Sequence, residues 1–234
     1  MLTRCPLLVF ALLATPACTH DGAANSDLDA GVDSTSACDP ASVLPSAYRP
    51  IATVSTGAVQ VSTNEGKTSG TIDATAGGLM NAADRPYVYV DLRDGKRVDV
   101  DDLAARSSKT WDVALKRSSL RVNGGDSGTG NRRLAVVQAA SMGDVMVAPA
   151  TGYATDDFTT DDCMLEALPG GEPRSAFGEW YAYDPQTHAV SPKSEVYVIE
   201  RDDGSRTAFR IVTYYGDTTM PMRGAFYRVE WKQL

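Results

Sequence analysis

His188 is the one histidine in the part of the chain that we expect to fold, within the segment Pro185–Val190. The proline ahead of it predicts a turn between two strands. A neutral imidazole in such a turn can ligate a metal or a cofactor through its free lone pair. A lone histidine in a turn is more often an ordinary surface residue, so His188 needs support from a second observation.

Ser127 lies in Gly125–Gly128 (Gly-Asp-Ser-Gly), which resembles the nucleophile segment of chymotrypsin-like serine proteases. That chemistry needs a histidine base beside the serine. The chain has only His20, in a polar N-terminal stretch, and His188. Because no nucleophile–base pair can be assembled, we interpret the segment as a glycine-rich turn and expect no enzymatic activity.

Aspartates gather in three short runs, Asp99–Asp102, Asp156–Asp157 and Asp161–Asp162. Calcium takes several oxygen ligands, but none of these runs has the spacing of an EF-hand loop. Solvated acidic loops are therefore the simpler interpretation. Zinc is less favoured still, since one histidine and one or two thiols make a poor tetrahedral set.

The N-terminal segment Met1–Ala17 has the layout of a secretory signal peptide, with Arg4 ahead of the apolar run Leu7–Ala14. That run is too short for a permanent membrane-spanning helix, which needs about 20 residues. Cys18 directly follows the expected cleavage point, as the lipidated cysteine does in bacterial lipoproteins. We predict export and lipidation at Cys18, and the alternative is ordinary secretion.

Residues 18–47 are rich in alanine, serine, aspartate, threonine and glycine, so they predict a flexible tether. Residues 48–234 are long enough for a single domain. The net charge of −8 becomes −9 when the signal peptide leaves with its one basic residue, Arg4. A chain this acidic, without a basic block, is a poor candidate for binding nucleic acid.

Two cysteines, Cys38 and Cys163, remain after Cys5 leaves with the signal peptide and Cys18 takes the lipid. An exported protein meets an oxidising compartment, so we predict a Cys38–Cys163 disulfide. In the chain-entropy model such a long closed loop stabilises the fold by about 4 kcal/mol. Two buried free thiols are the alternative.

From about Tyr48 onward, apolar and polar residues alternate, which indicates β-strands. Residues 87–92 and 97–100 flank Asp-Gly, the pattern of a β-hairpin. Residues 101–106 predict one helical turn capped by Asp101 or Asp102. Trp111 to Leu115 and Leu120 to Val122 alternate in opposite phase, which predicts one strand with a bulge near Ser118 and Ser119.

The rest of the chain shows further strands and one long loop. Strands are predicted at residues 134–139, 145–148, 177–183, 195–200, 207–215 and 225–231. Residues 151–173 lack a period and predict a loop, and Asp203-Gly204 predicts a tight turn. Because no sustained 3.6-residue apolar stripe appears, we predict an all-β, mainly antiparallel fold with at most short helical turns.

Two stretches resemble the HmuY family of haem-binding lipoproteins. The first joins Tyr87–Lys96, Trp111–Arg117 and Arg121–Gly128, in which a Trp-Asp strand leads to Asn-Gly-Gly-Asp-Ser-Gly. The second comprises Trp180-Tyr181, His188, Pro192-Lys193, Val196–Ile199, Asp203-Gly204 and Ile211–Tyr215. The order and spacing of these residues agree with the family over roughly residues 86–231.

The resemblance implies a hand-shaped β domain that clasps haem between protruding loops at the cell surface. Known members take haem from host carriers and pass it to an outer-membrane transporter. They hold the iron with two axial side chains, either two histidines or two methionines. We therefore expect haem or a related tetrapyrrole as ligand, no metal beyond the haem iron, and a haem transporter of the outer membrane as partner.

The sequence departs from the family because the domain lacks a second histidine. His188 lies near the expected place of one ligand, and Met164 is our choice for the second, since His–Met ligation occurs in cytochromes c. Met142 and Met146 lie in the same region, and core packing explains any of these methionines equally well. Tyr183 could stack on the porphyrin or ligate the iron.

The sequence thus predicts a lipid-anchored protein of the outer membrane or cell surface that captures haem for iron acquisition without catalysis. The alternative is a relative of the same fold that has lost haem and binds a protein or another apolar ligand. A concave apolar pocket beside His188 would favour haem, and a filled, flat surface there would favour the alternative.

Overall fold

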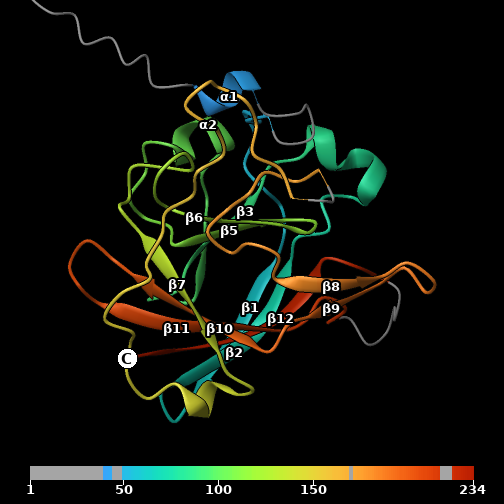
Figure 1. Cartoon of the computed structure of the whole chain (residues 1–234). Coiled ribbons are helices and arrows are strands. Elements are labelled where there is room, and N and C mark those ends of the chain that lie inside the picture. The colour runs from blue at the N-terminus through green and yellow to red at the C-terminus, as the bar shows by residue number, and fades with distance from the viewer. Residues whose placement is uncertain (1–38, 44–48, 169–170, 217–222) are drawn as a thin grey trace, which may run out of the picture. The chain divides into compact units, whose positions relative to one another are not determined.

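Antiparallel strands form two sheets and a separate hairpin, which confirms the predicted all-β fold (Figure 1). The computed structural model describes residues 39–43, 49–168, 171–216 and 223–234. The helical segments within these residues are short: α1 (Pro40–Val43), η2 (Leu79–Asp84), α2 (Asp102–Ala105) and η3 (Met142–Asp144). None of the described helices is long and apolar enough to cross a membrane. Of the two predicted caps of α2, Asp101 and Asp102, the structure has Asp101, whose side chain accepts a hydrogen bond from the Ala104 amide.

The larger sheet has six strands and joins the two ends of the described chain. Its order is β1 (Val59–Asn64), β2 (Lys67–Asp73), β12 (Phe226–Gln233), β11 (Arg206–Thr213), β10 (Glu195–Glu200) and β7 (Arg133–Gln138). The predicted Asp203-Gly204 turn connects β10 to β11. The pairing register shifts between Ile211 and Thr213, and this bulge turns the side chain of Tyr214 into the core beside Ile211. The regular alternation of side chains along β11 therefore ends at the bulge.

The smaller sheet has four strands, in the order β4 (Lys96–Val98), β3 (Val88–Asp91), β5 (Val113–Lys116) and β6 (Ser119–Val122). The Asp-Gly hairpin between β3 and β4 is confirmed. The predicted bulged strand is wrong, because Lys116 pairs with Ser119 across a tight turn and the chain reverses there. Arg117 occupies the left-handed region in this turn, with φ of 52°. The apolar alternation changes phase between Leu115 and Leu120 because the chain reverses direction at the two-residue turn between β5 and β6.

The two sheets pack face to face over the main core. Ile72, Phe209 and Trp231 enter this core from the larger sheet, and Val90 and Leu115 enter it from the smaller one. Each sheet is also covered on its outer face: α2 packs there on the smaller sheet and the η3 segment on the larger. Burial on both faces explains the continuous apolar runs of β3, β5 and β10. The predicted strand at 145–148 is wrong, because these residues follow η3 as a covering loop.

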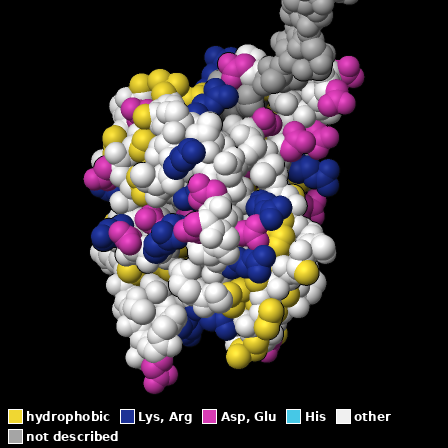
Figure 2. All heavy atoms as spheres, turned by 90° about the vertical axis from the view of Figure 1, so that its left-hand side faces the viewer, with side chains coloured by type: hydrophobic (Ala, Val, Ile, Leu, Met, Phe, Trp, Pro, Cys, Tyr) yellow, Lys and Arg dark blue, Asp and Glu magenta, His cyan; other side chains and the backbone are white. Residues whose placement is uncertain are grey.

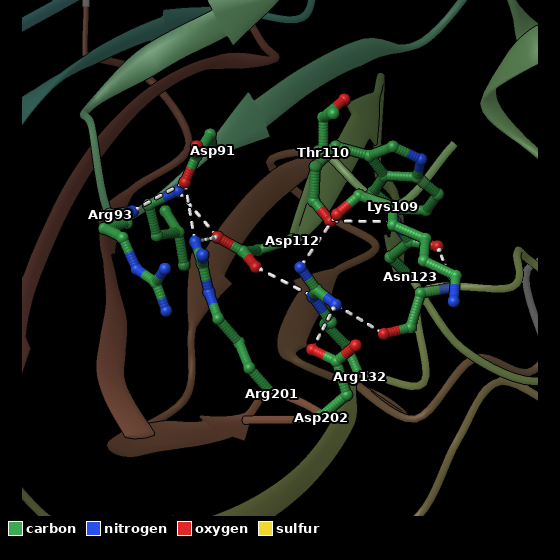
Figure 3. Close-up of polar contacts among 12 residues, drawn as sticks. Asp91, Arg93, Lys109, Thr110, Asp112, Asn123, Arg132, Arg201 and Asp202 are labelled. Carbon is green, nitrogen blue, oxygen red and sulfur yellow. Dashed lines mark hydrogen bonds and ion pairs between the residues drawn. The ribbon is translucent and has the colours of Figure 1, made fainter. Parts of the chain in front are cut away.

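A buried ion network ties the smaller sheet to the β10–β11 turn (Figure 3). Asp112, 1% exposed, accepts hydrogen bonds from Arg201 and, at 3.2 Å, from Arg132 Nε. Arg201 also binds Asp91 at 2.6 Å, and Arg132 binds Asp202 at 3.1 Å. Burial raises the pKa of the Asp112 carboxyl, and the two guanidinium groups oppose that shift. On the surface, basic and acidic side chains are interspersed on the face shown in Figure 2.

Candidate functional site

A two-stranded hairpin, β8 (Tyr181–Asp184) and β9 (Ala189–Pro192), extends beside the two sheets (Figure 1). Its turn covers residues 185–188, as predicted. The Asp184 carboxylate holds the turn by accepting from the Thr187 hydroxyl at 2.7 Å and from the Gln186 amide at 2.8 Å. These hydrogen bonds lower the pKa of Asp184. His188 ends the turn in the left-handed region, with φ of 56°.

Tyr183 and His188 meet at the tip of this hairpin. Tyr183 Oη lies 2.5 Å from His188 Nδ1, and the two ring centroids are 6.0 Å apart. Both residues are exposed, Tyr183 by 52%. When Nδ1 donates its proton to the phenol oxygen, Nε2 keeps its lone pair and can ligate a metal. The contact therefore holds the ring of His188 while leaving its second nitrogen available.

The base of the hairpin rests on a cluster of aromatic side chains. Trp180 contacts Tyr181, Tyr214 and Tyr227, with ring centroids 4.8, 5.8 and 5.5 Å away. Tyr215 Oη accepts a hydrogen bond from the Val190 amide at 3.1 Å. Burial raises the pKa of Tyr214 to about 12, so its phenol stays protonated at neutral pH. The hairpin is therefore fixed at its base and exposed at its tip.

Tyr181, at the aromatic base, and Tyr183, at the exposed tip, lie on one face of the hairpin. Tyr181 pairs with Pro192 and Tyr183 with Val190, so these four side chains share a face. Tyr181 and Val190 pack against the main core, whereas Tyr183 lies two residues nearer the tip. Sequence analysis missed Tyr215, although the adjacent Tyr214-Tyr215 in a strand was a visible signal. The face offers planar apolar rings and one imidazole, which suits a flat aromatic ligand.

Met164, the predicted partner of His188, lies in a different loop. Thr160 closes this loop by donating its amide to the Met164 carbonyl at 2.9 Å, and an isolated bridge joins Thr159 to Leu165. Met164 is 66% exposed, and among the described residues no hydrogen bond joins it to the hairpin. The structure therefore brings Tyr183 and His188 into contact and holds Met164 in a separate loop, so its role as second ligand stays a prediction.

Cys163 precedes Met164 and is disulfide-bonded. Its predicted partner, Cys38, lies outside the described residues, so the pairing stays a prediction. The predicted signal peptide of residues 1–17, the lipidation site Cys18 and most of the tether also lie outside them. The same holds for the domain boundary at residues 47 and 48.

The other polar candidates are explained by structural contacts. Ser127 is 4% exposed, and its hydroxyl donates to Asp156 Oδ2 at 2.5 Å. Asp156 also accepts from the amides of Val122 and Ala176, so it fastens the long 151–180 loop to β6. Asp102 is likewise buried and accepts from the Tyr87 amide. Among the described residues no group of three or more potential ligands could hold a metal ion.

Three hollows of the described part have linings that do not include the hairpin. The first, of about 290 Å³, is lined by residues 53–57, 73–77, 85, 86 and 88 with Leu115. The second, of about 380 Å³, is lined by residues of β1, β2, β11 and β12. The third, of about 250 Å³, is lined by residues 146–148 and 204–206 with Leu234. None of these three linings includes Tyr183, His188 or Met164. A ligand at the hairpin tip would therefore bind an exposed aromatic face.

The model of the HmuY protein family matches residues 84–226, which is more than half of the chain. The chain belongs to the HmuY family. Comparison with curated proteins gives no match. The matched residues include the whole smaller sheet, the strands β7, β10 and β11 of the larger sheet, and the β8–β9 hairpin.

Solved structures share this fold at low sequence identity. A candidate lipoprotein from Bacteroides fragilis has a TM-score of 0.51 and 16% identity, over 75% of this chain and 94% of its own. The apo HmuY analogue of Tannerella forsythia has a TM-score of 0.51 and 17% identity, over 71% and 95%. A candidate HmuY-like haem-binding protein from Bacteroides vulgatus has a TM-score of 0.49 and 18% identity, over 75% and 96%. At these identities the likeness concerns the fold alone.

Proposed function

We propose that this HmuY family protein binds haem or a related tetrapyrrole at the β8–β9 hairpin, as a carrier without catalytic activity. The observation that carries the proposal is the contact between Tyr183 Oη and His188 Nδ1 on an exposed hairpin tip. Bound haem would supply an iron atom with axial positions for protein ligands. His188 would offer Nε2 to one of them, and Tyr183 would hold the imidazole ring.

The residues of the hairpin fit this ligand in two respects. The exposed phenol ring of Tyr183 lies on the same face of the hairpin as Tyr181, two residues nearer the tip, and porphyrin rings stack on exposed aromatic side chains. The single imidazole supplies one axial ligand, and Met164 stays the proposed second one. We further propose that lipid on Cys18 holds the protein at the outer membrane or cell surface, where an outer-membrane transporter would receive the haem.

A haem titration of the purified protein tests this function. We expect a sharpened Soret band that saturates at one equivalent, is lost in His188→Ala and is kept in Gln186→Ala, a matched change in the same exposed turn. A parallel Met164→Ala titration tests the second ligand through the spectrum of the reduced protein. Saturable binding in His188→Ala would move the iron ligands to methionine or tyrosine and contradict the site.

The alternative is a HmuY-like surface module that has lost haem and binds a protein or another apolar ligand. The absence of Tyr183 and His188 from the three described cavities favours it. Titration without saturable haem binding by the wild-type protein would reject the haem proposal and leave this module.

A further inference from the structure

A polar cavity of about 290 Å³ opens beside the end of β2, independent of the hairpin. Its volume is near the lower end of small-molecule pockets, which span about 300–1,000 Å³. The buried side chains of Ala74, Val88 and Leu115 form an apolar part of its wall. Hydroxyl side chains supply much of the rest: Thr53, Ser55, Thr56 and Thr75. Such a lining suits a small ligand with both polar and apolar parts.

Two residues that line the cavity have backbone amides without a hydrogen-bond acceptor among the described residues. The chain turns through three consecutive residues with positive φ, Ala76 at 50°, Gly77 at 73° and Gly78 at 98°. The Gly78 amide donates to the Thr75 carbonyl, whereas no described bond uses the amide of Ala76 or Gly77, and both residues line the cavity. Successive free amides in such a turn form a concave binding surface for anions.

Arg85 adds a positive charge to the same cavity. It is exposed, and its guanidinium makes no ion pair within the described residues. The backbone of Arg85 is held in place, because the buried ammonium of Lys116 donates a hydrogen bond to the Arg85 carbonyl at 3.1 Å. A second cation therefore lies next to the cavity wall.

Asp73 is the one carboxylate in the lining, and it is already satisfied. Its Oδ1 accepts from the Thr75 hydroxyl at 2.6 Å and its Oδ2 from Arg223 at 3.1 Å. Its charge is thus balanced by Arg223. We propose that this cavity binds the carboxylate or phosphate group of a small molecule, through the guanidinium of Arg85 and the amides of Ala76 and Gly77.

Amide chemical shifts of the full purified protein test the proposal, with inorganic phosphate and butyrate as separate probes and chloride keeping the ionic strength constant. At least one probe should shift the Ala76 and Gly77 resonances along a saturable curve. Arg85→Gln should weaken that binding about tenfold, because it removes a charge-assisted hydrogen bond. Lys109→Gln, which removes an exposed charge outside the cavity, should leave it unchanged.

The response of the two probes identifies the ligand group. Saturation by phosphate alone indicates a phosphate-bearing ligand, and saturation by butyrate alone indicates a carboxylate beside the apolar wall. Linear shifts with both probes, or equal affinities in Arg85→Gln and wild type, would overturn the site. Because neither probe contains haem, this result is separate from the test of the hairpin.

Discussion

The phenol oxygen of Tyr183 and Nδ1 of His188 are joined by a 2.5 Å hydrogen bond at the tip of a hairpin whose base is packed. A hydrogen bond to one imidazole nitrogen sets which tautomer the ring adopts and how the other nitrogen points. This single contact converts a lone turn histidine into a candidate ligand with a defined orientation.

Removing the Tyr183 hydroxyl should weaken haem binding and keep it saturable. Tyr183→Phe retains the ring and loses the hydrogen bond to His188, and such supporting contacts change metal affinity by about 10- to 100-fold. Haem titration followed at the Soret band measures the change, with Gln186→Ala as control. Equal affinities in Tyr183→Phe and wild type would show that His188 needs no support.

Stability should depend on pH through Asp156. Burial raises its pKa from 3.8 to about 7, although the hydroxyl of Ser127 and two amides lower it. The folded state therefore binds more protons than the unfolded state between about pH 4 and 7. The free energy of unfolding should fall across this window as pH rises, by at most about 1.4 kcal/mol per pH unit, and level off above it.

Urea unfolding of Asp156→Asn at several pH values checks this assignment. The variant should lose that part of the pH dependence, and it should be less stable overall by about 1–3 kcal/mol because amides lose an acceptor. An unchanged pH profile would assign the dependence to other buried carboxyls.

The buried ion network should matter far more than the exposed pair beside it. Arg201→Met leaves the Asp112 carboxylate buried with one cation fewer, which should cost about 3–5 kcal/mol. Arg93→Met breaks the pair with Asp203, both half-exposed, and should cost less than about 1 kcal/mol. Chemical denaturation measures both, and equal losses would contradict the ranking.

The turn between β1 and β2 should accept a stabilising change. Glu65 and Gly66 both have positive φ, at 50° and 76°, and asparagine adopts this conformation more easily than glutamate. Glu65→Asn should stabilise the protein by about 0.5–1 kcal/mol, and Glu65→Val should destabilise it. Thermal unfolding measures both variants; a lower melting temperature for Glu65→Asn would refute the strain argument.

The predicted Cys38–Cys163 disulfide should be visible as a mass difference. Alkylation of the mature protein without reduction should leave both thiols unlabelled, and reduction should expose them and lower stability by about 4 kcal/mol. Two labelled thiols before reduction would remove the disulfide.

Sequence reasoning found elements whose local pattern matches their environment. The Asp94-Gly95 hairpin, the helical turn capped by Asp101 and the strand Glu195–Glu200 all depend on neighbouring residues, and all were predicted. The strand β2, with the sequence Lys-Thr-Ser-Gly-Thr-Ile-Asp, was missed because its partners β1 and β12 define it. Such a polar segment forms a strand because distant parts of the chain pair with it.

The candidate site was predictable only in part. His188 and Tyr183 were chosen for their chemistry and the family resemblance, and the structure brings the two side chains into contact at the end of the β8–β9 turn. The position of Met164 depends on a 30-residue loop, 151–180, fastened by Asp156 to amides far along the chain. The periodicity of a sequence predicts local structure and carries no information on such long-range hydrogen bonds. The position of Met164 relative to His188 could therefore not be predicted from sequence spacing.

The hairpin is anchored at Trp180 and exposed at His188, so the residues that stabilise the fold differ from those that we propose to bind the ligand. Substitutions among residues 185–188 would change the ligand that we propose at the tip, while the buried aromatic side chains that maintain the fold would remain in place. Exchanging one exposed side chain of the tip for another should therefore cost little stability, so the proposed binding specificity could change by single substitutions without loss of the fold.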